Sequence, residues 1–202
     1  MVGLVVAGVG IAAFVRARLG LAPWDVLHQG ISRHTGIPIG TVTILVGIPM
    51  LALWWPLRER PGGGTFINLV LVGSTVDVAL AVWPPVHGLV LRIAVLAGGM
   101  ALVAVGIGVY IAAELGPGPR DGVMTGLHHR LGWSIAFART VIETSALGFG
   151  LLLGGTAGVG TVLFAFGIGP LVQLSLRWFG YEVRRVEVLG NEPVDAMGLA
   201  GE

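Results

Sequence analysis

The stretch LGLAPWDVLHQGISRHTG, from Leu19 to Gly36, decides the fold because the chain writes its pattern twice. The second copy, LGPGPRDGVMTGLHHRLG, runs from Leu115 to Gly132 and keeps Leu, Gly, Pro, Asp, Gly and Gly at the same offsets. The register of 96 residues continues without a gap over positions 9–80 against 105–176. A second block, GGGTFINLVLVGSTVDVAL (62–80), then aligns with GVGTVLFAFGIGPLVQLSL (158–176). A gapless register through two distinct motifs indicates an internal duplication.

The composition predicts an integral membrane protein. The 202 residues are 54% hydrophobic and 11% charged, with a mean hydropathy of +0.87, whereas a soluble domain carries about 25% charged residues. The absence of cysteine excludes disulfides and thiolate metal sites. A net charge of +1, without a basic stripe, argues against a nucleic-acid partner.

Six apolar segments are candidates for membrane-spanning helices, which need roughly 20 residues each. The first is short, and its counterpart in the second copy begins upstream of the position that matches Met1. Either this helix is truncated or the natural start lies upstream, and we expect the latter. The predicted spans are Val2–Val15, Ile39–Trp55, Thr65–Trp83, Gly88–Ala113, Ile135–Leu153 and Gly158–Trp178.

Each Pro-x-Asp sequence predicts the start of a further, short helix. Proline lacks the N–H that would have no partner at a helix start, and an aspartate in the first turn meets the positive end of the helix dipole. We therefore expect helices that begin at Pro23 and Pro119 and end at Gly36 and Gly132. Such helices either lie flat at the membrane interface or enter the bilayer as re-entrant half-helices.

These elements predict an all-α membrane protein of six spans arranged as two three-helix repeats. Because three is odd, the second repeat enters the membrane from the opposite side, which makes the halves inverted repeats. We place the first repeat at 1–86, the second at 87–179 and a polar, disordered tail at 180–202. Eight of the twelve arginines fall on the side of both termini, which predicts that the termini and the tail are cytoplasmic.

Three motifs carry a resemblance to a known family. LG-x-x-PWD-x-x-x-x-G spans Leu19–Gly30, TG-x-x-IGT spans Thr35–Thr41, and a Gly-Thr sequence followed by a spaced Gly and Asp spans Gly64–Asp77. Together they resemble the YczE/YitT family of bacterial inner-membrane proteins. The resemblance implies a six-span, internally duplicated protein of the bacterial plasma membrane, and it implies transport only by analogy of architecture. The second copy reads Pro-Arg-Asp, so a role of Trp24 would not be shared.

Polar residues within or between the spans are the candidate site, since a charge near a helix centre costs about 2.5–3.5 kcal/mol. Asp77 and its counterpart Gln173 would face each other across the repeat axis, unless Asp77 forms a structural hydrogen bond to a neighbouring helix. Arg139 and Glu143 are spaced to pair on one helix. The candidate binding residues are Asp25, Asp121, Asp77, Gln173, Glu143 and Asn68, and those of the structural motif are Gly20, Pro23, Gly30, Gly116, Pro119 and Gly126.

Alternatives remain open for the other polar residues. Asp25 and Asp121 either form a paired polar site or only cap their helices, and the five histidines are interpreted as interfacial side chains. No catalytic or metal-ligand motif is present in the sequence, so we expect no enzyme activity, no metal and no cofactor.

Two functions are consistent with these features. The first is a transporter or channel for a small solute or ion, with a polar site between the repeats. The second is a non-transporting accessory or regulatory subunit that binds a lipid, another membrane protein or a second copy of the chain. Its support is the pair Gly150 and Gly154, a spacing that suits helix contacts.

Overall fold

The computed structural model describes residues 1–113 and 116–178, which form eight helices and no strand. Five helices are long and apolar enough to cross a membrane. The sixth expected span, α1 (Val2–Ala17), is apolar but has only 16 residues. The tail predicted at 180–202 lies outside the described residues. The five long helices are α3 (Ile39–Leu57), α4 (Gly63–Val82), α5 (Leu89–Ala112), α7 (Ile135–Leu152) and α8 (Val159–Trp178).

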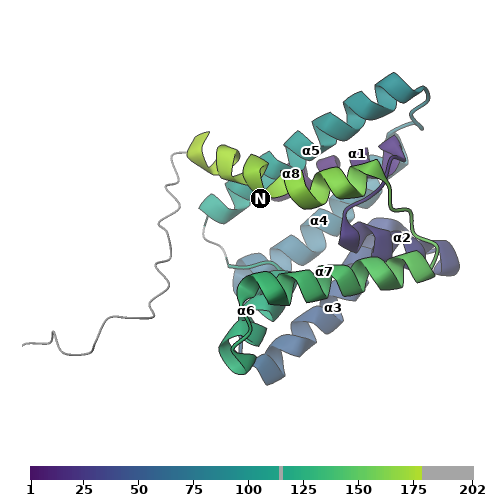
Figure 1. The fold of residues 1–202 in the computed structure, drawn as a ribbon. Helices are drawn as coiled ribbons and strands as arrows, with labels where there is room; N and C mark the ends of the chain where they lie inside the picture. The colour runs from purple at the N-terminus through teal and green to yellow at the C-terminus, as the bar shows by residue number, and fades with distance from the viewer. Residues whose placement is uncertain (114–115, 179–202) are drawn as a thin grey trace, which may run out of the picture.

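Two short helices, α2 (Pro23–Thr35) and α6 (Pro119–Leu131), begin at the prolines from which their starts are predicted. Each is closed by a glycine in the left-handed conformation, Gly36 or Gly132, the usual C-terminal stop. Each is also preceded by a glycine with positive φ, 114° at Gly20 and 108° at Gly116. In Figure 1, α2 and α6 lie towards opposite ends of the bundle.

The most extensive helix contact in the described chain is the crossing of α1 and α5. A Cβ atom on Gly3 would lie 2.7 Å from the carbonyl oxygen of Gly106, and one on Gly10 would lie 2.7 Å from that of Gly99. Glycines therefore let the two backbones touch. In the 96-residue register Gly3 matches Gly99 and Gly10 matches Gly106. The two contacts are therefore the same contact with the two halves exchanged.

The short helices pack against the opposite half in the same exchanged manner. Helix α2 lies on α7, and α6 lies on α3. A Cβ on Gly30 would lie 2.7 Å from Cβ of Leu153, and a Cβ on Gly126 would lie 2.7 Å from Cβ of Leu57. Gly30 and Gly126 are counterparts in the register, as are Leu57 and Leu153.

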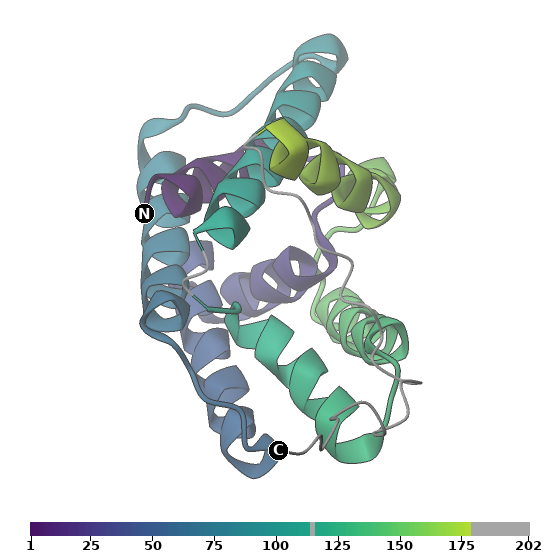
Figure 2. The ribbon, with the colours of Figure 1, turned by 90° about the vertical axis from the view of Figure 1, so that its left-hand side faces the viewer.

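The two halves differ in how their last two helices pack. Helices α3 and α4 are in contact where Gly40 and Gly73 bring the backbones together. The counterparts are Ala136, which carries a side chain, and Gly169, which has no atom within 4 Å of its Cβ position. The α7 and α8 backbones accordingly stay apart (Figure 2). Helix α8 keeps its contact with α5, the counterpart of the contact between α4 and α1.

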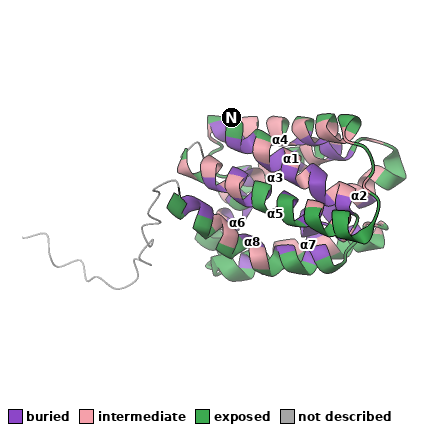
Figure 3. Cartoon of the chain, turned by 90° about the horizontal axis from the view of Figure 1, so that it is seen from above, coloured by how far each residue is buried: buried purple, intermediate pink, exposed green. Residues whose placement is uncertain are grey.

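The outer surface of the bundle is apolar. Figure 3 shows exposed residues along the outward faces of the helices, and large side chains such as Val90, Leu152 and Phe166 are 83%, 82% and 81% exposed. An apolar surface of this extent is unfavourable in water and suits contact with lipid chains.

Candidate functional site

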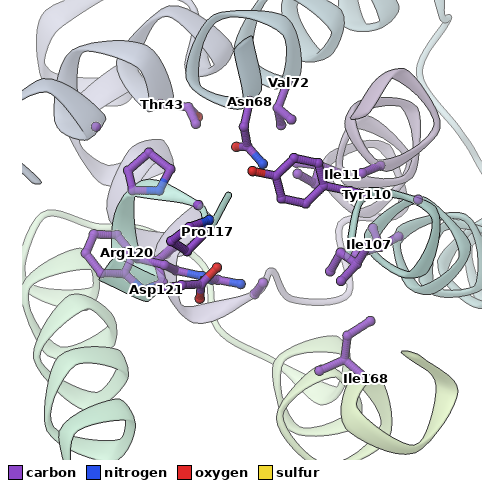
Figure 4. Close-up of a pocket in the computed structure, with 18 of the residues that line it drawn as sticks. Ile11, Thr43, Asn68, Val72, Ile107, Tyr110, Pro117, Arg120, Asp121 and Ile168 are labelled. Atoms are coloured by element: carbon purple, nitrogen blue, oxygen red, sulfur yellow. The ribbon is translucent and has the colours of Figure 1, made fainter. Parts of the chain in front are cut away.

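A cavity of about 780 Å³ lies between the two halves. Its volume is typical of sites for small organic molecules, and like them it is lined mainly by apolar side chains with a few polar groups. Figure 4 shows side chains from several helices converging on it. All eight helices contribute to the lining, and its polar side chains are Asp25, His28, Thr43, Asn68, Tyr110, Arg120, Asp121, Arg139, Glu143 and Gln173.

One polar group lies where α2 meets α3. The Thr43 hydroxyl donates to the carbonyl oxygen of Ile39 at 3.0 Å, and its oxygen also lies 3.1 Å from Nδ1 of His28, within hydrogen-bond distance. The same Nδ1 lies 3.5 Å from Oδ1 of Asp25. Asp25 and His28 are 8% and 5% exposed, which is unusual for groups that can carry charge.

Trp24, next to Asp25, also lines the cavity. Its side chain is buried, and its indole N–H is buried without a hydrogen-bond partner. Within the described part of the chain this N–H has no acceptor. A buried donor left unpaired costs about 1–3 kcal/mol.

The second polar group surrounds the start of α6. The Tyr110 hydroxyl donates to the carbonyl oxygen of Gly116 at 2.6 Å, which fastens the turn before α6 to α5. Figure 4 shows the Asn68 amide beside this hydroxyl, with Arg120 and Asp121 facing them. Asp121 is half-exposed and lies 3.9 Å from Nε of Arg120.

The third polar group is the predicted pair on α7. Nε of Arg139 donates to Oε1 of Glu143 at 3.1 Å, and both side chains line the cavity. The predicted pairing is confirmed, and it does not remove Glu143 from the cavity wall.

Asp77, by contrast, is not part of the cavity wall. Its carboxylate accepts from the backbone N–H groups of Gly40 at 2.6 Å and Thr41 at 2.7 Å, and from the Thr41 hydroxyl at 2.7 Å. These N–H groups lie at the start of α3, where no partner exists within the helix. Of the two roles expected for Asp77, the structure thus supports the structural hydrogen bond. The predicted site shared with Gln173 is not formed, because Gln173 lines the cavity and Asp77 does not.

Two further expectations differ from the structure. The interpretation of His28 as interfacial is wrong, because this histidine is buried in the cavity wall. Gly150 does not form an outward contact face with Gly154, because Gly150 packs against the backbone of α2 and Gly154 lies in the turn after α7. For His28, the spacing in the sequence could have indicated its position, because it follows Asp25 by three residues and therefore lies on the same face of the helix.

The fold and the cavity define a multi-pass helical membrane protein. The chain belongs to a family of unknown function, DUF6198, whose model matches residues 1–177. It is 37% identical over 173 residues to an "Uncharacterized protein" of Haemophilus influenzae, covering 86% of this chain and 79% of the relative. It is 31% identical over 176 residues to the "Uncharacterized membrane protein YczE" of Bacillus subtilis, covering 86% and 82%. The resemblance to YczE is thereby confirmed, and no solved structure matches the chain.

Proposed function

We propose that this protein binds a small solute in the cavity between two inverted repeats and moves it across the membrane. The observation that carries the proposal is the cavity itself, because polar side chains of both halves converge on one space of suitable volume. Both Pro-x-Asp helices contribute an aspartate to it, Asp25 from α2 and Asp121 from α6.

The exchanged contacts support the inverted arrangement. Gly3 meets Gly106 as Gly99 meets Gly10, and the same holds for the contacts of α2 with α7 and of α6 with α3. Such an exchange is expected when one unit is related to the other by a twofold axis. In transporters built this way, the binding site lies at the interface of the repeats and alternating access moves one repeat against the other.

A second function, a non-transporting accessory subunit, has its own support. Asp77 is satisfied within the chain, as a purely structural role requires. In addition, small residues follow one another on the exposed face of α7, at Ala136, Thr140, Thr144 and Gly148, a pattern that suits contact with another membrane helix.

The proposal is tested by the thermal stability of the purified protein in detergent against a panel of metabolites and ions. A ligand present at 100 times its dissociation constant stabilises the folded state by about 2.7 kcal/mol. We expect a ligand whose effect disappears in Asn68→Ala, a cavity variant, and persists in Ser74→Ala, an exposed position on the same helix.

Flux of that ligand into proteoliposomes then separates transport from binding. A panel without any stabilising ligand, together with a constant membrane partner in pull-down experiments, would contradict the proposal and support the accessory subunit.

A further inference from the structure

We propose that the solute is an organic monocation that binds at Asp25 in exchange for a proton held by the Asp25–His28 pair. This inference rests on the proposed function, since it names the class of solute for the same cavity. The charges that line the cavity and the residues that adjoin Asp25 carry it.

The charges of the cavity wall do not balance. The wall carries three carboxylates and two guanidiniums. Glu143 pairs with Arg139 at 3.1 Å, and Asp121 lies 3.9 Å from Arg120. Asp25 is left with a histidine as its charged partner in the described chain, so the wall holds one negative charge when His28 is neutral. A buried carboxylate requires a compensating positive charge, which a cationic solute supplies.

The surroundings of Asp25 suit an organic cation more than a hydrated metal ion. The indole of Trp24 adjoins Asp25 in the sequence and lines the same space, and aromatic rings attract cations through their π faces. The rest of the lining is largely apolar, with residues such as Ile107 and Phe164, and accommodates the body of an organic ion.

His28 gives the exchange its proton. Its Nδ1 lies 3.1 Å from the Thr43 hydroxyl oxygen and 3.5 Å from Oδ1 of Asp25, and an imidazole that already holds one proton takes a second on its other ring nitrogen. Histidine changes its charge near neutral pH, and the imidazolium would neutralise Asp25. Entry of the cation then releases one proton, so the charge of the wall is the same before and after.

The other groups that face this pair are either neutral side chains or carboxylates that lie beside an arginine. Helix α3 contributes the Thr43 hydroxyl, and α7 contributes the Arg139–Glu143 pair. Across the cavity lie the amide of Asn68, the Tyr110 hydroxyl, and Arg120 with Asp121. We therefore assign the proton that the solute displaces to the Asp25–His28 pair on α2.

Calorimetric titration of the purified full-length protein with tetraphenylphosphonium tests the inference. This probe is a permanent cation, so any pH dependence belongs to the protein. We expect binding of tetraphenylphosphonium and none of tetraphenylborate, an anion of the same shape. We also expect an affinity that rises with pH, by up to about tenfold per pH unit, as long as the unliganded pair still holds its proton. Equal binding of both probes, or an affinity independent of pH, would overturn the proposal.

Two variants assign the effect to the pair. Asp25→Asn should weaken tetraphenylphosphonium binding by about 30-fold or more, and His28→Gln should flatten the pH dependence while binding persists. Asp77→Asn removes the same charge outside the cavity and should leave the affinity unchanged. An unchanged affinity in folded Asp25→Asn protein would contradict the proposal.

The result is separable from the proposed function. Binding of the cation with the expected pH dependence, but without flux into proteoliposomes, would retain the cation site and reject transport. Flux of a neutral or anionic solute, without cation binding, would retain transport and reject the cation site.

Discussion

At the scale of single residues, Asp25 and Asp77 show how surroundings decide the role of a carboxylate. Asp77 accepts two backbone N–H groups and a hydroxyl at the start of α3. Asp25 lies in a cavity wall beside a histidine and an unpaired indole N–H. The first is a structural cap, and the second lies in the wall of the cavity that we propose as the binding site.

Asp77→Asn should destabilise the protein, because the amide offers one acceptor oxygen where the carboxylate offers two. The remaining backbone N–H would face an amide NH₂ group instead of an acceptor. We expect a loss of about 1–3 kcal/mol, measured by thermal or denaturant unfolding in detergent. Asp121→Asn is the matched control, since its half-exposed side chain should change stability little. Equal stability of Asp77→Asn and the unaltered protein would contradict the cap.

The sequence named five of the ten polar residues of the cavity wall as binding candidates, but not their surroundings. Asp25, Asn68 and Glu143 are polar groups in or beside apolar helices, a pattern that is visible without a structure. The different roles of Asp77 and Asp25 could not be predicted. Asp77 is a cap because it accepts from the start of another helix at Gly40, and the sequence does not show which helices pack together. The unpaired Trp24 N–H is equally invisible in the sequence, because pairing is a property of the packed state.

At the scale of helices, glycine determines which pairs approach closely. The α1–α5 crossing is possible because Gly10 and Gly99 leave room for a direct backbone contact. The α3–α4 contact depends in the same way on Gly40 and Gly73, and Asp77 fastens it further. Where the second half has Ala136 and Gln173 instead, α7 and α8 are not in close contact.

Gly10→Ala should destabilise the central crossing. The new Cβ would lie 2.7 Å from the Gly99 carbonyl oxygen, so the helices would have to move apart, at a cost of about 1–3 kcal/mol. Gly98→Ala lies on α5 with no atom within 4 Å and should be neutral or stabilising by up to about 1 kcal/mol, owing to the better helix propensity of alanine. Unfolding curves of the two variants check the difference, and a stable Gly10→Ala protein would contradict the close crossing.

Helix boundaries were predictable because local chemistry fixes them. Proline starts α2 and α6, and glycine in the left-handed conformation ends them. The separation of α7 from α8 was not predictable, because it follows from small differences between distant counterparts such as Gly40 and Ala136. The duplicated sequence suggested that the halves pack alike, whereas they differ there.

At the scale of the whole molecule, an inverted repeat requires that the two short helices end on opposite sides of the membrane. Thr35 and Leu131 are counterparts in the 96-residue register, and both are exposed at the ends of α2 and α6. The natural chain contains no cysteine, so a single introduced cysteine reports its own position without background.

The most direct test of the inverted repeat is therefore the labelling of Thr35→Cys and Leu131→Cys by a membrane-impermeant maleimide, in intact cells and in inverted vesicles. We expect Thr35→Cys to react only in intact cells and Leu131→Cys only in inverted vesicles, because most arginines lie on the side of Leu131. Labelling of each from opposite sides would support two inverted halves around one cavity. Labelling of both cysteines from the same side would contradict the inverted arrangement and, with it, the proposed route across the membrane.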